Sequence, residues 1–189
     1  MKIKLLLGIV SLFTVFTLAA CGSNQEEPNA TEGQDTDHSE MNHSDMSHSS
    51  SGVIPAGLKE ADNPTYPVES KAILKTDHMN GMKDAEATIV GAYNTTAYVI
   101  SYTPTTGGEK VENHKWIIQE EIKNAGRKTL EPGTEVTIEA SHMEGMDGAK
   151  GTIESSEKTT VYMVDYTPTT GGEEVKNHKW VTESELTSK

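Results

Sequence analysis

The sequence contains a single cysteine, Cys21, and only one long apolar run, and both lie within its first 21 residues. A lone cysteine offers neither a disulfide framework nor a cysteine metal site. Basic residues are also scarce, since 16 Lys and Arg oppose 29 Asp and Glu. Nucleic acid and anionic lipid head groups should repel such a chain, so we expect no nucleic-acid partner. A nucleophile elbow, a phosphate loop and a His-Glu-x-x-His helix are all missing, so we expect no catalysis.

The N-terminus has the pattern of a secretory signal. Lys2 and Lys4 precede the apolar run of residues 5–18, which is too short for a comfortable membrane-spanning helix. Cys21 follows Leu-Ala-Ala directly, as in the bacterial lipobox. We therefore predict a signal peptide at residues 1–20 and a lipid on Cys21. That lipid would hold the mature chain on the outer face of the cytoplasmic membrane. The alternative is an ordinary signal peptide that happens to contain a cysteine.

Residues 21–63 are rich in Ser, Asn, Glu, Asp and Gly and poor in large apolar residues. They cannot bury enough surface to offset chain entropy, so we expect a disordered tether. Within it, histidines and methionines each recur five residues apart: His38, Met41, His43, Met46 and His48. Imidazole suits both copper oxidation states and thioether suits Cu(I), so the tract favours copper capture. The alternative is a polar linker whose methionines are incidental.

The rest of the chain carries one segment twice, with an offset of 64 residues. Residues 76–116 align with 140–180 without a gap, and 23 of the 41 positions are identical. The shared motifs are His-Met-x-Gly-Met, Tyr-Thr-Pro-Thr-Thr-Gly-Gly-Glu and Asn-His-Lys-Trp. The positions that both copies share include every histidine outside the tail, together with four of the methionines.

Each copy predicts a small β domain, the first at residues 64–124 and the second at 125–189. Short alternating and β-branched segments indicate strands, separated by Gly and Pro turns. In the second copy we expect a hairpin turn at residues 155–158. The fold class is therefore mainly β, with two tandem SH3-like or KOW-type barrels, in which Trp116 and Trp180 fill or cap the cores. A barrel of about 60 residues is marginal alone, which favours packing of the two against each other.

The repeated histidines and methionines are candidate metal ligands. The turn should present imidazole and thioether together, and the last strand should supply the second imidazole of a site in each domain. The candidates are His78, Met79, Met82, His114, His142, Met143, Met146 and His178. The alternative is structural, because methionine fills irregular gaps well and a histidine can hydrogen-bond a loop.

The doubled motifs, the lipobox and the His/Met tail resemble the YdhK-type lipoproteins of Gram-positive bacteria, a family with a tandem domain of unknown function. Within that family the tail is similar to that of the CopL-type surface lipoproteins, which bind copper. The resemblance covers the whole chain and implies copper binding at the cell surface that limits copper uptake.

We therefore expect a lipid-anchored, extracytoplasmic protein that sequesters copper, with Cu(I) preferred and Cu(II) possible. Two alternatives stay open. The barrels could be SH3-like modules that bind the cell wall or a protein. The chain could also be a copper chaperone that feeds an efflux ATPase.

Overall fold

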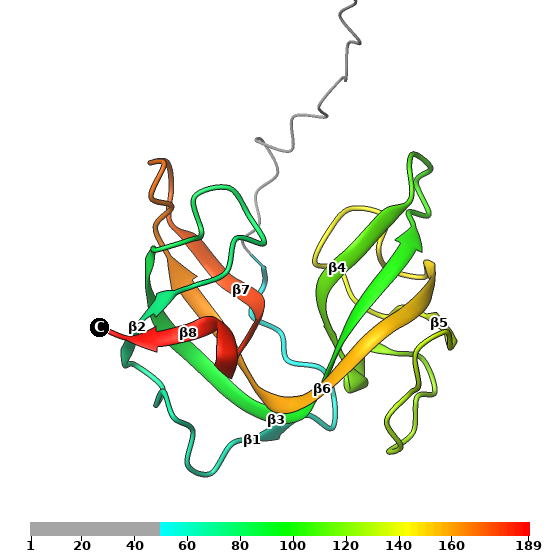
Figure 1. Ribbon diagram of the computed structural model, residues 1–189, viewed down its shortest axis with the longest axis horizontal. Helices are drawn as coiled ribbons and strands as arrows, with labels where there is room; N and C mark the ends of the chain where they lie inside the picture. Colours follow the sequence, from blue (N-terminus) through cyan, green and yellow to red (C-terminus); the bar gives the residue numbers. More distant parts are fainter. Residues whose placement is uncertain (1–49) are drawn as a thin grey trace, which may run out of the picture. The chain divides into compact units, whose positions relative to one another are not determined.

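The computed structural model describes residues 50–189 (Figure 1). These residues form strands and two short 3₁₀ turns, so the predicted mainly β class is confirmed. Their elements in chain order are β1 (Lys59–Glu60), β2 (Lys71–Leu74), β3 (Glu86–Thr103), β4 (Val111–Ile118), η1 (Gln119–Glu121), β5 (Glu135–Thr137), β6 (Lys150–Tyr166), β7 (Val175–Thr182), η2 (Glu183–Glu185) and β8 (Leu186–Ser188). No helix in this part of the chain is long and apolar enough to cross a membrane.

Strands β3 and β6 are long, antiparallel partners that run side by side over nearly their whole length (Figure 1). Ala87 faces Tyr166 at one end of this ladder, and Thr103 faces Lys150 at the other. Halfway along, the strands pair at Thr95 and Thr159, which are equivalent positions of the two repeats. The repeats are therefore related by an internal twofold symmetry centred on this pair.

The hairpin turn predicted at residues 155–158 is wrong, because these residues lie inside β6. Ser155, Ser156, Glu157 and Lys158 include none of the Gly, Asn or Asp residues that a tight two-residue turn requires. The β-branched Thr159 and Thr160 follow and favour continued strand. Because the strand continues without a turn, the second half of each repeat lies at the opposite end of the β3–β6 ladder from its first half.

The strands of the described residues form one eight-stranded sheet that is not closed into two barrels. Two hydrophobic clusters lie toward its ends, and each draws on both repeats. The first cluster combines Leu74, Met82 and Ile89 of the first repeat with Tyr162, Val164, Val181 and Leu186 of the second. The second cluster combines Tyr98, Ile100 and Ile117 of the first repeat with Val136, Ile138 and Met146 of the second. The boundary expected at residues 124–125 thus separates the repeats along the chain, whereas each cluster contains halves of both.

A central cluster lies between the other two and holds both tryptophans. Trp116 on β4 and Trp180 on β7 pack here with Ile118, Val161 and Met163, and Ile54 and Leu58 lie against the same group. Trp180 is fully buried and Trp116 is 7% exposed. The tryptophans therefore fill the junction of the two halves.

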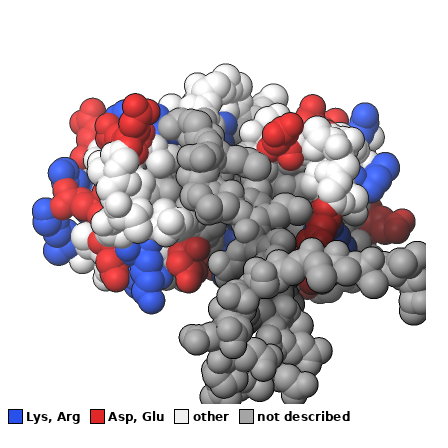
Figure 2. Space-filling view, turned by 90° about the horizontal axis from the view of Figure 1, so that it is seen from above, with Lys and Arg blue, Asp and Glu red and all other residues white. Residues whose placement is uncertain are grey.

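Acidic and basic side chains lie side by side on the visible face of the molecule (Figure 2). Lys176, for example, pairs with Asp165 at 3.0 Å and with Glu174 at 2.8 Å. Such pairs neutralise part of the negative charge locally.

Candidate metal centre

The turn that carries His142 is a compact loop between β5 and β6. The Met146 N–H donates to the Met143 carbonyl over 3.2 Å, which closes the turn. Gly145 has φ of +72°, in the left-handed region that glycine occupies at little cost. The turn therefore fixes His142 and Met143 on a short, defined backbone.

Each turn docks on the Tyr-Thr-Pro-Thr-Thr loop of the other repeat. The Gly145 carbonyl accepts from the Thr105 N–H over 2.8 Å, and the Gly81 carbonyl accepts from the Thr169 N–H over 2.9 Å. A Cβ added at Gly145 would lie 2.6 Å from the Thr106 hydroxyl oxygen, so only glycine fits. The glycine of the motif thus positions the turn histidine beside the opposite repeat.

The strand histidines follow asparagines in an unusual conformation. Asn113 and Asn177 both have φ of 52°, and the ladder shifts register beside them. The Asn113 N–H donates to the Ser101 hydroxyl over 3.2 Å, which supports this irregular backbone. Such a bulge re-aims the next side chain. His114, paired opposite Ile100, is consequently held on the side that faces the turn histidine.

His114 and His142, from different repeats, lie close together. Their ring centres are 6.4 Å apart, with the planes tilted by 41°. Tyr102 links the same group, since its ring packs edge-on against His114 at 5.9 Å. Its hydroxyl donates to the Met143 sulfur over 3.9 Å. The structure therefore gathers two imidazoles and one thioether, and it does so across the repeats and not within one copy.

The first-repeat turn docks on the second-repeat loop in the equivalent way. Tyr166 packs edge-on against His178 with ring centres 5.8 Å apart, which matches the Tyr102–His114 contact. The turn of His78 docks beside Tyr166, through Gly81 and Thr169. By the internal symmetry His78 and His178 correspond to His142 and His114.

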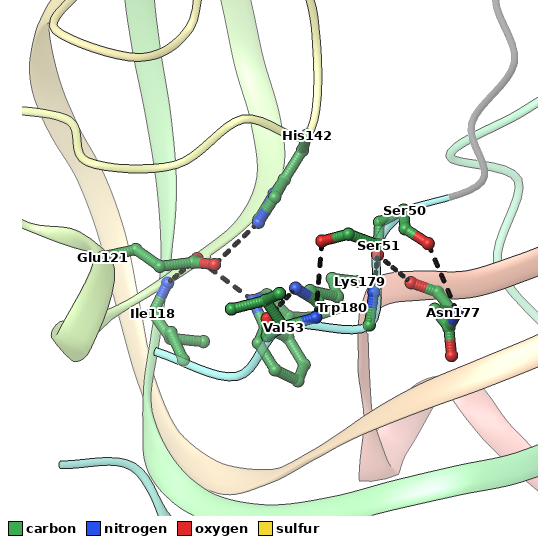
Figure 3. A network of polar contacts seen from close by, with 10 residues as sticks. Ser50, Ser51, Val53, Ile118, Glu121, His142, Asn177, Lys179 and Trp180 are labelled. Carbon is green, nitrogen blue, oxygen red and sulfur yellow. Dashed lines mark hydrogen bonds and ion pairs between the residues drawn. The ribbon is translucent and has the colours of Figure 1, made fainter. Parts of the chain in front are cut away.

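Glu121 holds the imidazole of His142 (Figure 3). One carboxylate oxygen lies 2.8 Å from His142 Nε2, and the other accepts from Trp180 Nε1 over 3.0 Å. The second oxygen also accepts from the Ile118 N–H over 3.2 Å. The Glu121 side chain is only 4% exposed. This buried carboxylate therefore ties the His142 turn to strand β7.

Glu185 plays the same part for His78. It lies 2.7 Å from His78 Nε2 and accepts from Trp116 Nε1 over 2.8 Å and from the Thr182 N–H over 3.0 Å. Burial raises the pKa of Glu185, but the contact with His78 and these hydrogen bonds outweigh it and bring the pKa to about 2. Glu185 is therefore an ionised acceptor at neutral pH.

The two glutamates were missed by sequence reasoning. Glu121 and Glu185 are equivalent positions, each five residues after the repeat's tryptophan. The alignment stopped at the tryptophan, and single carboxylates are inconspicuous in an acidic chain. Extension of the alignment by five residues would have found them.

The histidines retain buried nitrogens without hydrogen bonds. The carboxylates contact Nε2 of His78 and His142, and the Nδ1 atoms of both rings are buried and unpaired. Nε2 of His114 is also buried and unpaired. Burial, with smaller contributions from the charges of His142 and His78, lowers the pKa of His114 to about 3. His114 is therefore neutral at physiological pH and available as a metal ligand.

The methionines of each turn divide into two kinds. Met82 and Met146 are fully buried within the first and second clusters. Met79 and Met143 are partly buried, beside the turn histidines. The first kind fills the core, while the second kind places a thioether next to an imidazole.

Among residues 50–189, no three His, Cys, Asp or Glu side chains converge on a common point where a metal ion could sit. A metal centre here would therefore use two imidazoles with a thioether. A separate pocket of about 700 Å³ lies beside β5 and includes Tyr102, Val136 and Thr152 in its lining. None of the histidines lines it.

Cys21, the predicted lipidation site, and the tail ligands lie outside the described residues: His38, Met41, His43, Met46 and His48. The chain becomes described at Ser50, which is fastened to β7. The Ser50 N–H donates to the Lys176 carbonyl over 2.9 Å, and the Ser50 hydroxyl donates to the Asn177 carbonyl over 2.7 Å (Figure 3). Lys179 also donates to the Val53 carbonyl. The end of the tail is therefore tied to the strand that carries His178.

Comparison with known proteins agrees with this tandem organisation. A family model described as "Protein of unknown function (DUF1541)" matches twice, at residues 68–119 and 132–183. The chain belongs to the DUF1541 family. The "Uncharacterized protein YdhK" of Bacillus subtilis (strain 168) is 60% identical over 190 residues, which cover 100% of this chain and 92% of that protein. The predicted resemblance to YdhK-type proteins is thereby confirmed.

Solved structures from the DUF1541 family share the fold. A crystal structure of the Bacillus subtilis protein at 2.00 Å resolution superposes with a TM-score of 0.75 at 65% identity, covering 78% of this chain and 100% of that chain. A second crystal structure of YdhK gives a TM-score of 0.62 at 70% identity, covering 63% and 97%. A solution structure of the YdhK C-terminal domain gives 0.62 at 68% identity, covering 65% and 93%.

Proposed function

We propose that this chain is a lipid-anchored, extracytoplasmic copper-binding protein that sequesters Cu(I) at the cell surface and binds Cu(II) secondarily. One observation carries the proposal. The turn histidines His78 and His142 each give one ring nitrogen to a buried carboxylate and keep the other buried and unpaired. Histidines that ligate metals characteristically donate their second N–H to a carboxylate in this way.

The ligand types favour copper over harder cations. The described site offers imidazole nitrogens and a thioether, which suit Cu(I), and it lacks the oxygen cage that calcium or magnesium needs. Cu(I) is stable with few ligands, so two imidazoles and a thioether would suffice. No thiolate is needed, so binding would not depend on a reduced cysteine.

The described part of the chain begins beside a strand histidine. His48 lies two residues before Ser50 in the sequence. Ser50 is in turn hydrogen-bonded to Asn177, the neighbour of His178. Because the tail and the folded part belong to one chain, capture of an ion by the tail would raise its effective concentration for the histidines of the folded part. Capture by the tail followed by transfer to these histidines would serve sequestration.

The described surface does not favour a partner-binding module. Among residues 50–189, the exposed large apolar side chains are Val53 and Val68. They do not form the contiguous apolar patch that commonly marks a protein-binding face. Sequestration therefore has more support than a role in wall or protein binding.

Competition against a cuprous chelator tests the proposal. The soluble chain 22–189 is titrated with Cu(I) under anaerobic conditions in the presence of a colorimetric chelator. We expect the protein to retain Cu(I) with sub-nanomolar affinity, because imidazole and thioether ligands act together in a preformed site. Zn(II) in the same competition should bind far more weakly.

One control variant keeps the tail ligands and replaces the candidate His and Met ligands of the folded part. A second control variant replaces the tail ligands and keeps those of the folded part. A chain that yields all of its Cu(I) to the chelator, or that prefers Zn(II), is not a copper-sequestering protein.

A further inference from the structure

The imidazoles of His114 and His142 are spaced as a metal-bridged pair would be. A metal–nitrogen bond to imidazole is about 2 Å long and each nitrogen lies roughly 1 Å from its ring centre, so two imidazoles that share one ion have centres about 6 Å apart. The observed separation of His114 and His142 is 6.4 Å. Little movement is therefore needed for both rings to bind one ion.

The third ligand is also in place. Tyr102 touches both sides of the pair, because its ring packs against His114 and its hydroxyl contacts the Met143 sulfur. Tyr102 thus contacts both the His114 ring and the Met143 thioether, which makes that sulfur the candidate third donor. It is a soft donor, whereas the neighbouring Glu121 is already occupied by three hydrogen-bond donors. The local ligand set is two nitrogens and one sulfur.

The internal twofold symmetry duplicates this arrangement. Thr95 pairs with Thr159, its own equivalent, so the two ends of the ladder are related by this symmetry, and two contacts of the site recur across it. The Tyr166–His178 contact reproduces Tyr102–His114 within 0.1 Å in ring separation, as 5.8 Å against 5.9 Å. His78 reproduces the carboxylate contact of His142, at 2.7 Å against 2.8 Å.

We infer that the folded part holds two Cu(I) ions in equivalent sites, each assembled from both repeats. One site consists of His142 Nδ1, His114 Nε2 and the Met143 sulfur. The other consists of the equivalent atoms of His78, His178 and Met79. This inference rests on the copper function proposed above, and it adds the ligands, the stoichiometry and the cross-repeat pairing.

Paired substitutions in a full mature chain with a silenced tail test the pairing. The tail histidines become Asn and its methionines Leu, as H38N, M41L, H43N, M46L and H48N. This protein should bind two equivalents of Cu(I). The variant H114N/H142N, which damages a single proposed site, should still bind one equivalent. The variant H142N/H178N, which damages both sites, should bind none.

The reverse pattern overturns the inference. If each repeat built its own site, H142N/H178N would keep one equivalent and H114N/H142N would keep none. A tail-silenced chain that binds a single ion points to one shared central site and overturns it as well. A tail-silenced chain that binds none, while the unaltered chain binds Cu(I), leaves the proposed function standing on the tail alone. Failure of both proteins to bind rejects the function itself.

A second measurement needs no buried substitution. Nitrogen-15 NMR of the imidazoles in the tail-silenced chain distinguishes the two ring nitrogens. Addition of Cu(I) should shift Nδ1 of His78 and His142 and Nε2 of His114 and His178. Shifts confined to Nε2 of the turn histidines would mean that the carboxylate contacts are broken on binding, and the proposed ligand set would be wrong.

Discussion

A buried histidine has two nitrogens to satisfy, and the glutamates of this fold satisfy one. Each glutamate accepts from the turn histidine and the tryptophan of the other repeat. Glu121 contacts His142 and Trp180, and Glu185 contacts His78 and Trp116. The carboxylate thereby fixes the tautomer and the orientation of the ring, which leaves the other nitrogen free for a ligand. These two residues connect the candidate site to the fold.

Replacement of Glu121 should be costly even without metal. The change E121A removes the acceptor of three donors and leaves them buried, so we expect the free energy of unfolding to fall by about 3 kcal/mol or more. Urea denaturation followed by tryptophan fluorescence measures the loss. The matched change E112A, at a side chain that is 67% exposed, should alter stability by less than about 0.5 kcal/mol. Equal effects of the two changes would show that the Glu121 network is not stabilising.

At this scale the sequence predicts residue types better than residue partners. The repeated His and Met positions were identifiable because both copies keep them. Which histidine meets His142 depends on a strand crossing that no local pattern encodes. Met82 and Met146 have the same motif as Met79 and Met143, yet their surroundings place them in the core. The copper ligands of the tail remain predictions.

Among the elements, the turn and the loop that receives it act as one unit. The Gly145 carbonyl is bound by Thr105, and the Gly145 Cα faces Thr106 and Pro104. The glycine is needed for its backbone angle and also for close approach. Both requirements concern the position of His142.

Two glycine substitutions separate these requirements. G145A adds a methyl group 2.6 Å from the Thr106 hydroxyl at a φ of +72°, so both clash and backbone strain apply. We expect it to lower the free energy of unfolding by about 3 kcal/mol. G107A has a φ of +87° but nothing within 4 Å, so only the strain of about 1 kcal/mol applies. Thermal or urea unfolding measures both, and similar losses would show that the docking contact has little weight.

Strand positions were largely predictable from alternation and β-branched residues. The continuous strand at 155–158 was not, because a short polar segment between two strand patterns is compatible with a longer turn as well as with continued strand. The residues around it are satisfied equally well by continuous pairing with the other repeat. Only the pairing of Thr95 with Thr159 decides between the two, and it is a long-range contact.

At the scale of the whole molecule, the two repeats depend on each other because each hydrophobic cluster combines half of one repeat with half of the other. Each hydrophobic cluster contains both repeats, and β3 and β6 run through both clusters. Loss of one cluster would therefore remove the packing that stabilises one end of the β3–β6 ladder. The described residues should unfold as a single cooperative unit.

Core substitutions at opposite ends test this cooperativity. L74A lies in the first cluster and I138A in the second, and both side chains are fully buried. Each should lower the free energy of unfolding by about 3 kcal/mol, and each should leave a single transition in which fluorescence and far-UV circular dichroism coincide. V68A, at a side chain that is 51% exposed, serves as the control. Two separate transitions in either core variant would mean that the halves fold independently.

The pairing between the two repeats also has a consequence for folding during synthesis. β2, near the beginning of the described chain, pairs on one side with β8, whose last residue is Ser188. The ribosome synthesises β2 early and β8 last of the strands, so the first repeat cannot complete its pairing until the second repeat has been made. A premature stop only a few codons early would therefore leave its defect in the part of the molecule that was synthesised first.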